Sequence, residues 1–266
     1  MQPNKNEIKQ SLEIACRAAQ KAGAIHKKYF RSVLNVETKS TSFNLVSQAD
    51  LESEDIIVKT IKKYFPDHNF LTEEKKYAPT TSPYTWIIDP LDGTNNFIYG
   101  IPMFCVSIAL AYKDTLLVGV LYDVIHNELF TATKGGGAYL NDKAIHVRQD
   151  TSLKEAMLIT GFYYDRGENM KKNLKIINNF FQIPILGLRR LGAAAVDLCY
   201  VACGRASGFW EFGLNPWDFA AGIILVQEAG GRLTTPADKN VRFDINSDIV
   251  ASNGNIHNDM LAILQT

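Results

Sequence analysis

The sequence predicts a mixed α/β protein, with an antiparallel sheet in its first half and alternating strands and helices in its second half. Up to about residue 150, the β-rich runs YTWIID, FCVSIALAY, TLLVGVLYD and ELFTAT follow one another with tight connections, as in antiparallel sheets. Beyond residue 150, short apolar runs alternate with helical patterns, which is typical of helices packed on a sheet. The 266 residues, of which 46% are hydrophobic, suffice for one large domain or two lobes sharing an interface.

Helices are expected at the start of the chain and throughout its second half. Apolar residues from Ile8 to Ile25 recur at helical spacing, which predicts a first helix that runs to about Phe30. The segment NLVSQADLESEDIIVKTIKKYFP reads as a short turn and a second helix that ends before Pro66. Later helices are expected from about Arg166, in AAAVDLCYVACG, in PWDFAAGIILVQEAGG and at the C-terminus, between the strands AMLIT, ILGLRRL, SGFWE and DIVASN.

Composition and charge predict a cytoplasmic protein without nucleic-acid or membrane partners. The chain carries 28 basic and 28 acidic residues, so no basic excess points to nucleic acid or an acidic membrane surface. We find no signal-peptide core in MQPNKNEIKQ and no run of about 18 apolar residues that would span a membrane. The four cysteines form no CxxC pair or disulfide framework. The scattered histidines are assigned no catalytic role: His26, His68, His126, His146 and His257.

The segment WIIDPLDGTNNF places two aspartates directly after an apolar strand. We expect the strand to end at Asp89, because Pro90 cannot donate to a sheet and presets a turn. That turn would bring Asp89 and Asp92 together, with the Leu91 carbonyl on the same side. Gly93 permits an unusual backbone, and TNNF could open a short helix whose amides favour phosphate. This combination suits Mg²⁺ with a phosphorylated substrate. The alternative is a turn in which Asp92 only caps the helix.

Two further acidic segments could complete such a site. Glu73 and Glu74 follow a short apolar stretch in FLTEE, although adjacent acids are usually a solvated pair. Asp218 lies in the first turn of a predicted helix, with Asn215 as its N-cap and Pro216 at its first position. An acid at this position can also serve only to stabilise the helix. Periodicity alone leaves both interpretations open.

Taken together, these segments resemble the inositol monophosphatase family of Mg²⁺-dependent, lithium-sensitive sugar-phosphate phosphatases. The resemblance covers nearly the whole chain in order. Two departures, Thr72 and Asp142 at positions where the family usually or often has glycine, touch no presumed ligand atom. The resemblance implies a layered αβαβα sandwich of the sugar-phosphatase type, with an antiparallel N-terminal sheet and a mixed C-terminal sheet. It is carried by Lys39, NLVSQAD ending at Asp50, TEE, DPLDGTNNF, GGGAYLN, RRLGAAAVDLCYVACG, GFWE and NPWDFAAGIILVQEAGG.

The resemblance also implies roles for individual residues. Glu73 and Thr94 would position the attacking water, with Asp50 behind Thr94, and the amides of Gly93 and Thr94 would hold the phosphate. Four carboxylates in one cleft repel one another, which raises their pKa values unless cations are bound. The substrate would contact Asp92, Gly192, Ala193, Ala194 and Glu211. Two to three Mg²⁺ ions would be held by Glu73, Asp89, the Leu91 carbonyl, Asp92 and Asp218.

The expected function is Mg²⁺-dependent hydrolysis of a phosphate monoester of a cyclitol or sugar, most of all inositol 1-phosphate. Bound metals would activate a water and clamp the attacking and leaving oxygens, so no protein nucleophile is needed. Residues 1–266 are expected to form a single catalytic unit. Its first sub-lobe, about residues 1–150, would carry most metal ligands, and the second, about residues 151–266, would lie on the substrate side. The resemblance further implies a homodimer and inhibition by lithium.

Several alternatives stay open at this point. Related enzymes of this fold hydrolyse fructose 1,6-bisphosphate, histidinol phosphate or 3′-phosphoadenosine 5′-phosphate. A phosphatase of the haloacid dehalogenase type would space its two aspartates as DxD, whereas this chain has DxxD. A regulatory binding protein with residual phosphatase activity is a candidate from another class. Arg189 and Arg190 could contact substrate, line a subunit interface or form a solvated strand end.

Overall fold

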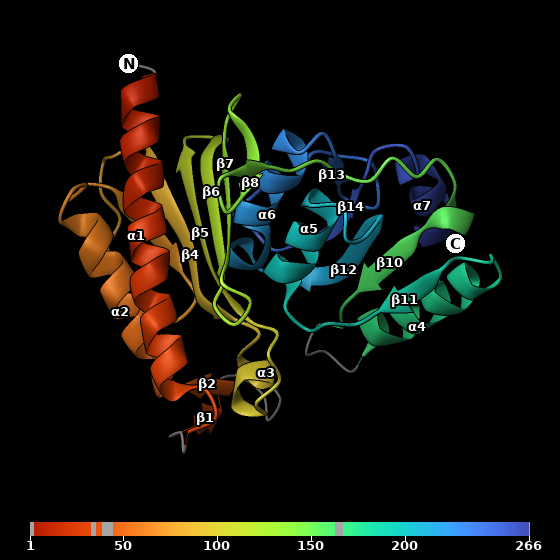
Figure 1. The fold of residues 1–266 in the computed structure, drawn as a ribbon, viewed down its shortest axis with the longest axis horizontal. Coiled ribbons are helices and arrows are strands. Elements are labelled where there is room, and N and C mark those ends of the chain that lie inside the picture. Colours follow the sequence, from red (N-terminus) through yellow and green to blue (C-terminus); the bar gives the residue numbers. More distant parts are fainter. Residues whose placement is uncertain (1–2, 33–35, 39–44, 163–166, 266) are drawn as a thin grey trace.

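The computed structural model describes residues 3–32, 36–38, 45–162 and 167–265 and arranges them in five layers (Figure 1). Two helices cover the outer face of a seven-stranded sheet, two lie between this sheet and a five-stranded one, and two cover the far face of the second sheet. This αβαβα order confirms the expected fold class. In layer order, the helix pairs are α1 (Lys5–Tyr29) with α2 (Gln48–Lys62), α5 (Ala194–Ala202) with α6 (Pro216–Glu228), and α4 (Glu168–Phe181) with α7 (His257–Leu264).

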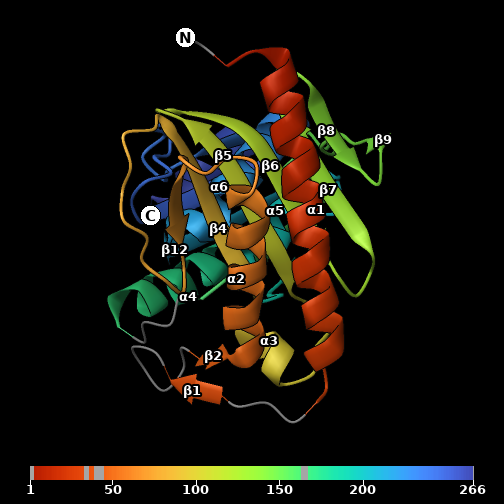
Figure 2. The same cartoon turned by 90° about the vertical axis from the view of Figure 1, so that its left-hand side faces the viewer.

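The seven-stranded sheet is built from consecutive strands, as their tight connections predicted. Its order follows the sequence, and every pair is antiparallel except β3 and β4, which run parallel at one edge. Figure 2 shows α1 and α2 lying across the outer face of this sheet. The strands are β3 (Asn69–Thr72), β4 (Tyr84–Asp92), β5 (Cys105–Tyr112), β6 (Thr115–Asp123), β7 (Glu128–Thr133), β8 (Gly137–Leu140) and β9 (Lys143–Ala144).

The expectation that β4 ends at Asp89 is wrong, because the strand continues to Asp92 through a bulge. Asp89 pairs with Ser107 of β5, and Asp92 pairs with Cys105, so three steps along β4 match two along β5. Pro90 is tolerated here because the bulge requires no N–H from it. The bulge therefore replaces the expected turn, and α3 (Thr94–Ile98) follows it as expected.

The five-stranded sheet is mixed, as expected. Its order is β11-β10-β12-β14-β13, with parallel pairs around β10 and antiparallel pairs around β14. The expected turn before α2 is wrong, because Leu45–Ser47 form β2 and pair with β1. The sequence also did not predict β1 and β13, three-residue strands that show no period. Arg166, the expected start of α4, lies outside the described residues. The remaining elements are β1 (Val36–Thr38), β2 (Leu45–Ser47), η1 (Leu153–Glu155), β10 (Met157–Thr160), β11 (Gly187–Arg189), β12 (Gly208–Leu214), β13 (Arg232–Thr234) and β14 (Ser247–Ser252).

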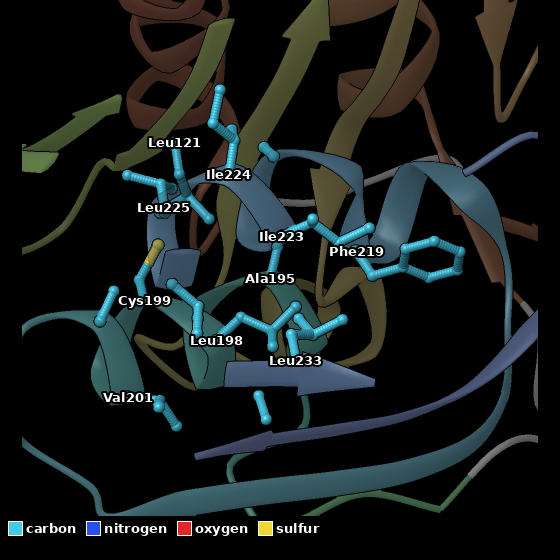
Figure 3. Close-up of a cluster of buried hydrophobic side chains, with 14 of the residues drawn as sticks. Leu121, Ala195, Leu198, Cys199, Val201, Phe219, Ile223, Ile224, Leu225 and Leu233 are labelled. Carbon is cyan, nitrogen blue, oxygen red and sulfur yellow. The ribbon is translucent and has the colours of Figure 1, made fainter. Parts of the chain in front are cut away.

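Three apolar cores hold the five layers together. The central core packs α5 and α6 between the two sheets, as Figure 3 shows for Leu198 and Ile223. A Cβ at Gly222 would overlap the Leu198 side chain, so glycine allows these two helices to approach closely. This packing fixes the start of each helix beside the bulge of β4. None of the helices in the described ranges is both long enough and apolar enough to cross a bilayer.

Candidate active site

A pocket forms where the β4 bulge, α3, the end of β12 and the starts of α5 and α6 meet. Two expected site residues lie outside its lining: Asp50 contacts Thr94, and Ala193 is buried as the N-cap of α5. The family residue Lys39 lies outside the described residues. The pocket brings together the other sequence-derived candidates: Glu73, Asp89, Leu91, Asp92, Gly93, Thr94, Gly192, Ala194, Glu211 and Asp218.

The backbone of the bulge is held by a local hydrogen bond, and the residue that follows it is fixed by close contacts. The Leu91 N–H donates to Oδ1 of Asp89 over 3.0 Å. Gly93 has φ +90°, and a Cβ there would lie 2.9 Å from the Met103 carbonyl oxygen and 3.1 Å from Cβ of Ala193. Only glycine fits both the left-handed backbone and this close approach. The chain can therefore turn from β4 into α3 directly beside the acidic groups.

Thr94 connects the bulge to α2. Its Oγ1 lies 2.9 Å from Oδ1 of Asp50 and 3.0 Å from the Leu91 carbonyl oxygen. The other oxygen of Asp50, Oδ2, accepts bonds from the Ser47 N–H over 2.8 Å and the Ser47 hydroxyl over 2.5 Å. Burial raises the pKa of Asp50 to about 6, and the hydrogen bonds from Ser47 and Thr94 oppose this shift. A hydroxyl and a buried carboxyl are thus positioned to share a proton.

Asp92 links the first sheet to the central helices. Its Oδ2 accepts the Ala195 N–H over 2.8 Å, at the start of α5 and 103 residues away in the chain. Burial raises the pKa of Asp92 to about 7; the amides of α5 oppose this shift and the charge of Glu73 adds to it. The sequence alternative, in which Asp92 caps the helix that follows it, finds no support, because α3 has Gly93 as its N-cap.

Asp218 both caps α6 and lines the pocket. Its Oδ2 accepts the Asn215 N–H over 2.7 Å, so the expected N-cap and the helix-stabilising role are both present. Burial raises the pKa of Asp218 well above its usual range, and the charges of Glu73 and Asp92 add to this shift. Asp218 therefore stabilises the start of α6 and also lines the pocket, so the two interpretations that periodicity left open do not exclude each other.

The Glu73 segment is held by an acid that the sequence interpretation missed. Glu54 of α2 is fully buried and accepts the Glu74 N–H over 2.9 Å and the Tyr77 hydroxyl over 3.2 Å. Thr72, one of the two departures from the family pattern, donates from its hydroxyl to the Lys75 carbonyl over 2.8 Å. Glu54 lies four residues after Asp50 on the same face of α2, and this spacing is the sequence signal that could have revealed it.

Glu211 and Arg190 also line the pocket. Burial raises the pKa of Glu211 to about 8, Asp92 adds to this shift, and Arg190 opposes it. Both arginines left open by the sequence are exposed; Arg190 lines the pocket, whereas Arg189 does not and donates to the Leu188 carbonyl. The other lining residues, which the sequence analysis did not single out for the pocket, are Asn95, Phe162, Leu214 and Asn215.

Asp197 is a further buried acid near the pocket. It lies in α5, and both of its carboxylate oxygens lack a hydrogen-bond partner within the described ranges. Burial raises the pKa of Asp197 well above its usual range, and the charges of Glu211 and Asp92 add to this shift. Its sequence signal is a single acid inside the apolar helix AAAVDLCYVACG. Asp197 therefore adds one acidic side chain to those expected near the pocket.

Comparison with known proteins gives one family over nearly the whole chain. The model of the inositol monophosphatase family matches residues 7–266. An inositol-1-monophosphatase from Synechocystis is 41% identical over 262 residues, which cover 96% of this chain and 88% of that protein. A protein named Nus factor SuhB from Escherichia coli is 41% identical over 253 residues, which cover 94% of both chains.

Solved structures share the same architecture. The extragenic suppressor protein suhB from Bartonella henselae has a TM-score of 0.91 at 38% identity, and the match covers 97% of this chain and 99% of that chain. An IMPase/NADP phosphatase complexed with Mg²⁺ and phosphate has a TM-score of 0.84 at 25% identity, over 96% of this chain and 95% of that chain.

Proposed function

Because this chain belongs to the inositol monophosphatase family, we propose that its acidic pocket hydrolyses a phosphate monoester of a cyclitol or sugar with the help of Mg²⁺. Inositol 1-phosphate is the substrate that we propose first. The observation that carries the proposal is the gathering of the Glu73, Asp89, Asp92 and Asp218 carboxylates and the Leu91 carbonyl around one pocket.

The donor set fits Mg²⁺, which prefers oxygen ligands and partners phosphate groups. Burial is the main cause of the raised pKa values of Asp92 and Asp218, and the charge of Glu73 adds to both; a divalent cation would favour the ionised carboxylates. Within the described ranges, no three acidic, histidine or cysteine side chains are already grouped as a metal site, so the carboxylates would have to move towards a shared ion. When bound, Mg²⁺ would make a water more acidic and offset the charge of the phosphate.

The residues of the chain itself would bind the phosphate and move one proton. The amides of Gly93 and Thr94 would hold phosphate oxygens at the start of α3. When the Thr94 hydroxyl donates to Oδ1 of Asp50, its lone pairs are free to accept a hydrogen bond from the attacking water. Both sub-lobes contribute groups, since Asp218 starts α6 and Glu73 follows β3. We therefore propose a single catalytic unit.

Mg²⁺-dependent phosphate release tests the proposal. We expect the protein to release phosphate from inositol 1-phosphate with Mg²⁺, to lose this activity after dialysis against EDTA and to regain it when Mg²⁺ is restored. A panel with fructose 1,6-bisphosphate, histidinol phosphate and 3′-phosphoadenosine 5′-phosphate would identify the preferred substrate. Full activity after chelation would contradict the proposed role of the metal.

A regulatory binding role is the second candidate, because relatives of similar identity carry the name Nus factor SuhB. The same assay separates the two: a folded protein that releases no phosphate from any substrate of the panel would favour binding alone. Phosphate release would leave room for a binding role beside catalysis. A homodimer and sensitivity to lithium are further proposals that rest on the family.

Glu211 is proposed to select substrates that carry hydroxyl groups. Bound Mg²⁺ would favour the ionised form of Glu211 over the protonated form that burial favours without metal. A hydrogen bond to a charged acceptor contributes about 1.5–3 kcal/mol, so in the presence of Mg²⁺ Glu211→Gln should lower kcat/KM for inositol 1-phosphate roughly ten- to a hundredfold. Hydrolysis of an aryl phosphate without hydroxyls should change much less, because the Mg²⁺ ligands are untouched. Parallel kinetics on the two substrates measure the difference.

Glu228→Gln is a suitable control for this comparison. Glu228 accepts the N–H groups of Gly135 and Gly137 and does not line the pocket. We expect its variant to leave both substrates unchanged. An equal loss on both substrates in Glu211→Gln would instead place Glu211 in the metal site or in the support of the fold.

Without metal, the protein is expected to become less stable as the pH rises. Asp92 and Glu211, with pKa values raised to about 7 and about 8, hold their protons more tightly when folded than when unfolded. A folded state that binds more protons loses stability between the ordinary carboxyl pKa of about 4 and these raised values. The Tm of EDTA-treated protein should therefore fall from about pH 5 to about pH 8, and saturating Mg²⁺ should reduce that fall. A Tm that rises over this range without metal would contradict the electrostatic account.

A further inference from the structure

We propose that His26 is a positioning residue, which holds the backbone of the β4 bulge in place for the residues that line the pocket. His26 lies in α1, and its Nε2 is 3.0 Å from the Pro90 carbonyl oxygen, 64 residues away in the chain. This contact joins the outermost helical layer to the segment between Asp89 and Asp92. The proposed consequence for Mg²⁺ binding rests on the proposed function.

The Pro90 carbonyl needs a partner because the bulge interrupts the sheet. Regular pairing between β4 and β5 stops at Asp89 and resumes at Asp92, so Pro90 and Leu91 lie outside the regular ladder. Pro90 is buried, and a buried carbonyl without a hydrogen bond is unfavourable. The Leu91 carbonyl oxygen lies 3.0 Å from the Thr94 hydroxyl, and the histidine supplies the donor for Pro90.

The surroundings of His26 make it a fixed and permanent donor. The side chain is completely buried, and its ring centroid lies 5.8 Å from those of Phe97 and Phe104. Burial lowers the pKa of His26 to about 3, so the ring is neutral. A neutral ring carries one N–H, and a bond to a carbonyl requires it on Nε2. Nδ1 then has no hydrogen-bond partner within the described ranges.

The position of this contact ties it to the site. Before a cation binds, the positions of the Asp89 and Asp92 carboxylates depend on their hydrogen bonds and on the bulge backbone that carries them. Pro90 lies directly between Asp89 and Leu91, two of the proposed ligands. If its carbonyl lost its donor, the bulge would be held less firmly, and the three proposed ligand positions that it carries, Asp89, Leu91 and Asp92, could shift with it.

Two substitutions of His26 distinguish the loss of its hydrogen bond to Pro90 from a change in core packing. His26→Leu keeps an apolar side chain of moderate size but removes the donor, whereas His26→Gln offers an amide N–H at a similar reach. The matched control is His257→Leu. His257 is also completely buried and neutral, with its nitrogens 2.9 Å from the hydroxyls of Ser252 and Thr234, but it lies in α7 away from the pocket.

Calorimetric titration of the metal-free full-length proteins with Mg²⁺ measures the consequence. We expect His26→Leu to weaken Mg²⁺ binding roughly ten- to a hundredfold, as the loss of supporting groups around metal ligands commonly does. His26→Gln should recover most of the affinity. His257→Leu should lower Tm and leave the affinity for Mg²⁺ unchanged. Wild-type affinity in His26→Leu, or equal losses in all three variants, would overturn the proposal.

Amide hydrogen exchange of the metal-free proteins measures the bulge directly. The Leu91 N–H, bonded to Asp89, should exchange faster in His26→Leu than in His26→Gln or His257→Leu. Unchanged exchange in His26→Leu would overturn the positioning role. A wild-type protein that binds no Mg²⁺ would overturn the proposed function, and the exchange result would then decide the role of His26 independently.

Discussion

Asp218→Asn is expected to abolish most phosphate release while leaving the protein folded. Asparagine keeps an oxygen that can accept the Asn215 N–H, so the cap of α6 should survive. The substitution removes one negative charge from the proposed Mg²⁺ site. Metal ions contribute several kcal/mol of transition-state stabilisation, and each ~1.4 kcal/mol is tenfold in rate, so we expect a loss of about a thousandfold or more.

The matched control for this experiment is Asp123→Asn. Asp123 is also buried and accepts two backbone N–H groups, those of Ile125 and His126, but it does not line the pocket. Its variant should keep the full rate even if it lowers Tm. If Asp218→Asn kept its activity and lost only thermal stability, Asp218 would be a helix cap and not part of the catalytic site.

Thr94→Val is expected to give the second largest effect. Valine has the shape of threonine without the hydroxyl, so the bonds to Asp50 and to the Leu91 carbonyl are lost while the packing is kept. General acid–base groups contribute typically about 10²- to 10⁴-fold, so kcat should fall by a factor in this range with little change in KM. Thr94→Ser, which restores the hydroxyl, should recover much of the rate.

Thr160→Val controls for the loss of a buried hydroxyl. Thr160 is buried in β10 and donates to the Trp210 carbonyl over 2.9 Å, outside the pocket. We expect this variant to retain the wild-type kcat. A Thr94→Val protein with the same kcat as the wild type would remove Thr94 and Asp50 from the proton transfer.

Much of the fold could be predicted from local sequence patterns. The helical period in α1 reflects a single face packed on a core, whereas the continuous apolar runs of β4, β5 and β6 reflect burial on both faces of the sheet. The end of β4 was predicted wrongly because Pro90 was read as a terminator. Its effect depends on β5, which accommodates the proline in a bulge and pairs again at Asp92. Local turn chemistry does not contain that information.

The candidate site could likewise be predicted only in part from the sequence. Asp218 was recognised in the sequence as a capping acid, but its place beside the β4 bulge depends on how α6 packs against β4, β5 and β6. His26 was missed because a single histidine on an apolar helix face reveals burial but not its partner, and Glu54 because it stands among other acids in QADLESED. Their partners, the Pro90 carbonyl and the Glu74 N–H, are backbone groups that no side-chain pattern reports.

The most direct test of the account is the position of a bound divalent cation. Mn²⁺ takes oxygen ligands similar to those of Mg²⁺ and can be located by its anomalous scattering in crystals of this protein. We predict an anomalous peak in the pocket, within coordination distance of Asp89, Asp92 and the Leu91 carbonyl, that disappears when EDTA is added. Crystals saturated with Mn²⁺ that show no peak at these oxygens, or a peak only elsewhere on the protein, would contradict the proposed metal site.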